Sequence, residues 1–178
     1  ERRTDMDIAI LLIRVGVGAT LAAHGAQKLF GWFHGHGIAG TAGFLESLGF
    51  RPAKAYAWLL GGAELLGGLA LAVGLLTPLA ATVVAAVMVG AILAVHREKG
   101  FFAQAGGYEY PLALAVASLA TAFAGAGRYS LDHVFGWSLA GEEWGVAAVV
   151  AALGLGLAAV ASRNLRVGRW RQHHPART

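Results

Sequence analysis

The chain has 178 residues, of which 57% are hydrophobic and 13% are charged; its mean hydropathy is +0.59 and its net charge is +4. Because soluble domains carry about a quarter charged residues, this composition excludes a soluble domain with a polar shell and indicates a membrane protein. Cysteine is absent, which excludes disulfides, thiolate-bound iron–sulfur clusters and covalently attached c-type haem, so any cofactor is non-covalent.

The first two apolar segments each contain charged residues. The first, at about residues 8–33, carries an arginine, a histidine and a lysine, and it is too long for a signal peptide. The second, at about 55–76, holds one acid, Glu64. Both have the length of a membrane span. Between them, residues 41–50 place their apolar side chains on one side, which predicts a short interfacial or re-entrant helix.

The next two segments have uncharged interiors and lie at about residues 78–96 and 109–127. Thr77 before Pro78 is typical of a helix N-cap followed by proline at the first helical position, so we expect a tight antiparallel hairpin with the preceding helix. The glycine-rich segment 100–110 is too short to span and is expected to fold back against the bundle. Residues 1–140 are thus expected to form a four-helix transmembrane bundle.

A fifth apolar segment, 141–163, leads into a basic tail at 164–178. The fold class expected is therefore an all-α integral membrane protein: a four-helix bundle plus a fifth, C-terminal transmembrane helix. The basic tail is expected to lie in the cytoplasm and to contact lipid rather than nucleic acid. An even number of spans, with the last segment not crossing, is the alternative.

The buried charges are the strongest functional signal. An ionisable group in hydrocarbon costs at least about 2.5 kcal/mol, so such groups face the bundle interior, form pairs or line a path. On the first helix, Arg14, His24 and Lys28 lie within about 80° of one another around the helix axis. Glu64, on the second helix, is closest in depth to His24. We expect one polar pocket that also includes residues near the inner boundary. Its predicted members are Arg14, His24, Lys28, Glu64, His96, Tyr108 and Glu109.

Several simpler interpretations of these residues stay open. The buried ions would equally serve as salt bridges that fix helix register. An axial haem pair of His24 and His96, or a metal site at His34 and His36, has little support in the spacing. We therefore predict no metal and treat the histidines as hydrogen-bonded or interfacial.

Taken together, these motifs resemble the DoxX family over roughly residues 8–135. The residues that carry the resemblance are Arg14 with Gly18, His24 to Leu29, Gly61 to Gly68 around Glu64, Gly74 to Thr77, His96, Gly100 to Phe102, Gly107 to Pro111 and Ser130 to Asp132. The resemblance implies a four-helix bacterial inner-membrane module associated with redox systems. Some relatives resemble subunits of a thiosulfate:quinone oxidoreductase, and others are partners of superoxide dismutase and a sulfurtransferase. The resemblance implies that the polar motif positions of the family correspond here to Arg14, His24, Lys28, Glu64, His96, Glu109 and Asp132.

Three functions follow as hypotheses. The first is a membrane subunit or partner of a quinone-linked or oxidative-stress redox complex, whose polar pocket holds the head group of menaquinone or ubiquinone. Such a chain would not be catalytic alone, because a protein partner would have to carry the redox centres. The second is a non-catalytic scaffold, with Ala147, Ala151 and Gly154 as a docking face. The third is a small transporter. The sequence leaves the substrate and the oligomeric state open.

Overall fold

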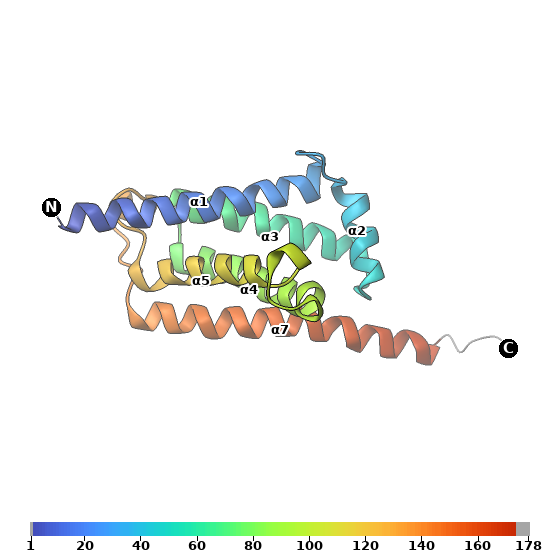
Figure 1. Ribbon diagram of the computed structural model, residues 1–178. Helices are drawn as coiled ribbons and strands as arrows, with labels where there is room; N and C mark the ends of the chain where they lie inside the picture. Colours follow the sequence, from blue (N-terminus) through green and yellow to red (C-terminus); the bar gives the residue numbers. More distant parts are fainter. Residues whose placement is uncertain (1, 174–178) are drawn as a thin grey trace.

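The computed structural model describes the backbone of residues 2–173 and the side chains of residues 4–163, and this part of the chain contains helices and no strand (Figure 1). The α-helices are α1 (Arg2–Phe30), α2 (Gly37–Ser47), α3 (Ala53–Val73), α4 (Thr77–Ala91), α5 (Glu109–Ala124), α6 (Leu131–Val134) and α7 (Glu142–His173). A π-helical turn, η1 (Ile92–His96), and a 3₁₀ turn, η2 (Arg97–Lys99), continue α4, and η3 (Ala103–Ala105) lies in the following loop. The all-α fold is confirmed.

Four helical segments are long and apolar enough to cross a membrane: Thr4–Phe30, Ala53–Val73, Thr77–Lys99 and Glu142–Arg163. The C-terminal segment is thus a helix of spanning length. In contrast, α5 has 16 residues, about 24 Å, against a hydrocarbon thickness of about 30 Å. The expected span over 109–127 is therefore too long, because Gly125 takes a positive φ of 83° and ends the helix. The side chains of the basic tail, 164–178, lie outside the described residues.

Glycine sets the distance between α1 and α3, which run antiparallel side by side (Figure 1). A Cβ atom built on Gly68 would lie 2.6 Å from the backbone nitrogen of Ala22, and one built on Gly18 would lie 2.6 Å from that of Ala72. Such contacts are closer than any real Cβ atom tolerates. The two backbones therefore touch in a way that only glycine permits.

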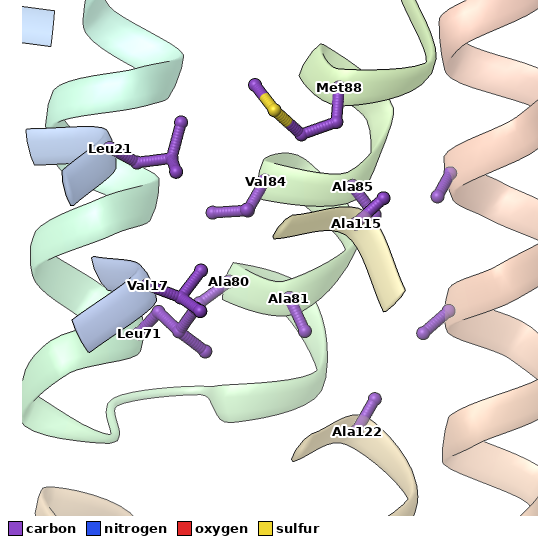
Figure 2. Close-up of a cluster of buried hydrophobic side chains, with 12 residues drawn as sticks. Val17, Leu21, Leu71, Ala80, Ala81, Val84, Ala85, Met88, Ala115 and Ala122 are labelled. Atoms are coloured by element: carbon purple, nitrogen blue, oxygen red, sulfur yellow. The ribbon is translucent and has the colours of Figure 1, made fainter. Parts of the chain in front are cut away.

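Small side chains also form the core between α3, α4, α5 and α7. Leu71 and Val84 are fully buried there beside a set of alanines (Figure 2). On α7, Gly156 packs against Val89 of α4. Because the side chains of alanine and glycine are small, the helix backbones approach closely, and α7 packs against α4 and α5 (Figure 1).

The hairpin between α3 and α4 forms as expected, but the predicted N-cap is wrong. Thr77 is the first helical residue, and Leu76, with φ 47° and ψ 49°, occupies the N-cap position. The Thr77 hydroxyl is buried and makes no hydrogen bond. Instead, the carboxylate of Asp132 accepts from the backbone N–H of Leu76 at 2.6 Å and of Thr77 at 2.9 Å. A residue that is distant in sequence therefore caps α4.

The structure has a helix near the predicted segment 41–50 but with earlier bounds, and a hydrogen-bonded fold within the segment 100–110 that was expected to fold back against the bundle. Helix α2 occupies Gly37–Ser47 and buries Thr41 and Leu45. The segment 100–110 folds back on itself, because the N–H of Tyr108 donates to the carbonyl of Gly100 at 3.1 Å.

Candidate functional site

The centre of the candidate site is an ion pair between α1 and α3. Lys28 Nζ lies 2.6 Å from Glu64 Oε2. The Glu64 side chain is 5% exposed and that of Lys28 is 25% exposed, so the carboxylate is enclosed while the ammonium is partly accessible. Glu64 Oε2 is buried. Lys28 is therefore the part of the pair that a further molecule could reach.

Helix geometry explains how Lys28 reaches an acid near the middle of α3. Lys28 lies close to the end of α1, and helical side chains tilt toward the N-terminus of their own helix. The lysine stem therefore runs back along α1 toward the level of Glu64. The backbones are close at this level, because a Cβ atom built on Gly25 would lie 2.7 Å from the carbonyl oxygen of Gly61.

Hydrogen bonds from side chains of α1 and α2 hold the end of α1 that carries Lys28. The Thr41 hydroxyl of α2 donates to the Lys28 carbonyl at 3.2 Å, which satisfies a carbonyl at the end of α1. The Gln27 side chain donates to the carbonyl of Phe33 at 3.4 Å. Lys28 and Glu64 are thus the members of the predicted pocket that the structure joins, and the half-buried His24 lies one turn before Lys28 on the same face of α1.

Arg14 is not part of this group, so the single pocket expected from the sequence is wrong in this respect. The Arg14 side chain is fully buried, and its Nη2 donates to the Tyr129 carbonyl at 2.6 Å. Its Nη1 lies 3.4 Å from the carbonyl oxygen of Ala72. Ala72 is eight positions beyond Glu64 on α3, about 12 Å along the helix. Arg14 faces protein as expected, but at the other end of the bundle.

The three predicted members near the inner boundary organise a loop instead. His96 Nδ1 lies 2.7 Å from the carbonyl oxygen of Gly106, and Glu109 Oε2 accepts from the N–H of Ala103 at 2.9 Å. The Tyr108 ring packs edge-on against Phe101 with centroids 5.5 Å apart. Among the described residues, no hydrogen bond or ion pair joins these three side chains to Lys28 or Glu64.

Asp132 is the important polar residue that the predicted pocket did not contain. It is 1% exposed, and both of its carboxylate oxygens accept backbone N–H groups of α4. In the sequence, Asp132 is marked only by the motif Ser130-Leu131-Asp132. No local pattern indicates that its carboxylate caps the helix that begins at Thr77, 55 positions earlier. Asp132 and Arg14 together hold the segment 128–137 against the α3–α4 hairpin.

We predict that Asp132→Ala destabilises the protein by about 2 kcal/mol, because two buried N–H groups lose charge-assisted hydrogen bonds. Thermal unfolding in detergent micelles measures the effect. Asp5→Ala, an exposed acid in the first turn of α1, is the control and is expected to change the midpoint little. Equal midpoints for both variants would contradict the capping role.

Within the described residues, no three His, Asp or Glu side chains lie close enough together to hold a metal ion. His34 and His36 are exposed in the loop after α1. The ion pair of Lys28 and Glu64 is therefore the candidate functional site.

Comparisons with known proteins agree with the motifs. The family described as DoxX matches residues 9–97. A protein of Bacillus subtilis (strain 168) named "Putative oxidoreductase CatD" is 30% identical over 126 residues, which cover 71% of this chain and 86% of that protein. No solved structure matches the chain.

Proposed function

Because this chain belongs to the DoxX family of membrane proteins, we propose that it is a membrane subunit or partner of a redox complex and that its Lys28–Glu64 site holds a quinone head group. The observation that carries the proposal is the ion pair enclosed between α1 and α3, with Lys28 still partly accessible. The name of the relative, "Putative oxidoreductase CatD", supports a redox role.

The residues of the site suit the chemistry of quinone reduction. A quinone carbonyl needs a hydrogen-bond donor, which Lys28 Nζ or a His24 ring nitrogen supplies. Reduction of a quinone to a quinol consumes two electrons and two protons. The protons come from solvent, and the Glu64 carboxylate, or the His24 ring one turn from Lys28, would take up a proton and pass it to the quinone. The electrons come from a partner protein, because this chain has no cysteine to hold an iron–sulfur cluster. Either menaquinone or ubiquinone fits this chemistry.

Charge supports a cytoplasmic orientation for the Lys28 end of the bundle. The chain at this end carries Arg51, Lys54, Arg97, Lys99 and Arg163, whereas the opposite end carries Arg2, Arg3 and Arg128. Basic residues favour the cytoplasmic side of a bacterial inner membrane. In this orientation the quinone head group enters from the cytoplasmic leaflet.

The proposal is tested with protein reconstituted in liposomes and titrated with menaquinone or ubiquinone. We expect saturable quenching of tryptophan fluorescence and recovery of bound quinone by extraction. Glu64→Gln should weaken binding about tenfold, the equivalent of one hydrogen bond to a charged group. Glu46→Gln, which alters an exposed acid paired with Arg51, is the matched control. If the native protein shows no bound quinone and no quenching, the quinone site is abandoned.

A scaffold is the second candidate, and one observation favours it. Ala147, Ala151 and Gly154 are exposed on α7, and a Cβ atom on Gly154 would meet nothing within 4 Å. Small residues of this kind allow a further helix to approach closely. If the protein is only a scaffold, a partner co-purifies even when both Glu64 and His24 are replaced.

Transport has less support. Between Arg14 and Glu64, the glycine contacts bring the backbones of α1 and α3 together, and Leu21 and Leu71 are fully buried. This packing separates the two groups of buried charges by an apolar layer.

A further inference from the structure

A second polar site lies at the opposite end of the bundle from Lys28. A hollow of about 650 Å³ opens between the start of α1 and the chain from the end of α5 to Ala140. Its lining includes Asp7, Arg128, Asp132, His133 and Trp137. The volume falls in the range of small-molecule sites in proteins, roughly 300–1,000 Å³.

The shortness of α5 explains why a hollow forms here. At about 24 Å, α5 is about 6 Å shorter than the hydrocarbon layer, and irregular backbone takes its place. Irregular backbone at membrane depth is tolerated only where it is buried in protein or lines water. In Figure 1 this loop lies beside the start of α1, at the end that carries the N-terminus. The hollow is therefore expected to hold water at the edge of the membrane.

Two residues of opposite charge, Asp7 and Arg128, line the hollow without pairing with each other. The backbone N–H of Arg128 donates to Asp7 Oδ1 at 3.1 Å, which keeps the two residues adjacent. Among the described side chains, neither Asp7 nor Arg128 forms an ion pair. Asp7 is thus available to a cation and Arg128 to an anion, an arrangement that suits a ligand with both charges.

Aromatic side chains near the hollow match the membrane interface. Trp137 lines the hollow and is 45% exposed. Its ring lies 5.1 Å from that of Phe135, which is 56% exposed, and Tyr129, next in the chain to the lining residue Arg128, is 47% exposed. Exposed Trp and Tyr side chains are typical of the level of lipid headgroups. A binding site at the depth of the lipid headgroups favours a membrane lipid as ligand over a water-soluble molecule.

We propose that the hollow binds the phosphoethanolamine headgroup of a membrane phospholipid, with its ammonium on Asp7 and its phosphate on Arg128. A primary ammonium donates hydrogen bonds to the Asp7 carboxylate, whereas the trimethylammonium of phosphatidylcholine has no N–H to donate. Phosphatidylglycerol lacks the cation altogether. The site therefore selects phosphatidylethanolamine, independently of any quinone bound at the Lys28 end.

The absence of native cysteine makes the test direct. A single Ser138→Cys substitution places a thiol in the lining of the hollow, and its labelling rate by a charged methanethiosulfonate reagent is measured in nanodiscs. We expect labelling to be about tenfold slower in phosphatidylethanolamine than in phosphatidylcholine or phosphatidylglycerol, which corresponds to one charged hydrogen bond. Adding Asp7→Asn should restore the faster rate, whereas Glu142→Gln, an exposed acid outside the lining, should leave the protection intact.

Equal labelling rates in the three lipids would overturn the proposal. Protection by soluble O-phosphoethanolamine in phosphatidylcholine discs, without protection by phosphatidylethanolamine, would overturn the lipid as its source. Where Ser138→Cys fails to fold, Ala140→Cys in the same lining replaces it.

Discussion

Gly68→Leu is expected to separate α1 from α3 and to destabilise the protein by about 3 kcal/mol or more. The reason is that the first atom of any side chain at Gly68 would lie 2.6 Å from the backbone nitrogen of Ala22, where no rotamer relieves the contact. Since the same helix contact positions Lys28 beside Glu64, quinone binding should be lost with it. Unfolding midpoints in detergent and the quinone titration measure the two effects.

Gly62→Leu is the matched control for this prediction. Gly62 lies on the same helix, six positions away, and a Cβ atom there would meet nothing within 4 Å. Leucine at this position should face lipid and leave both stability and quinone binding near native values. Equal destabilisation by the two substitutions would show that the glycine contact between α1 and α3 is not what limits stability.

Lys28→Met is expected to destabilise the protein by about 3 kcal/mol, because it leaves the enclosed Glu64 carboxylate without its counter-ion. The cost should fall when the acid is removed as well. The double variant Lys28→Met with Glu64→Leu should therefore recover most of the lost stability. Equilibrium unfolding of the two single variants and the double variant gives the coupling energy.

Two controls make this result specific. Lys54→Met removes an exposed lysine from α3 and should change stability little. A single Lys28→Met variant that is as stable as the double variant would contradict the paired, enclosed state of the two charges.

The sequence predicted the parts of this fold that depend on helical periodicity and on the cost of buried charge. Long apolar segments predicted the helices, and the angular stripe on α1 predicted that Arg14, His24 and Lys28 face protein. The glycines on both sides of Glu64 predicted that this acid approaches the first helix. The depth estimate placed Glu64 closest to His24, whereas the structure pairs it with Lys28, whose long side chain reaches back along α1.

The remaining errors concern contacts between distant parts of the chain. Arg14 shares an angular position with Lys28 but lies 14 positions earlier, about 21 Å along the helix. Asp132 replaces Thr77 as the cap of α4, and no local pattern connects these residues. His96 and Glu109 bond to backbone groups of the loop between them. A sequence pattern predicts which face of a helix carries polar residues, but it does not predict which groups these residues contact.

In the proposed function, a quinone head group lies against Lys28 and Glu64. The most direct test is photolabelling with an azidoquinone in liposomes, followed by mass spectrometric mapping of the modified residues. We expect labels between His24 and Leu29 on α1 or within one turn of Glu64 on α3, and competition by unlabelled quinone. Labels confined to the hollow around Asp7 and Trp137, or spread over the lipid-facing side of α7 without competition, would contradict it.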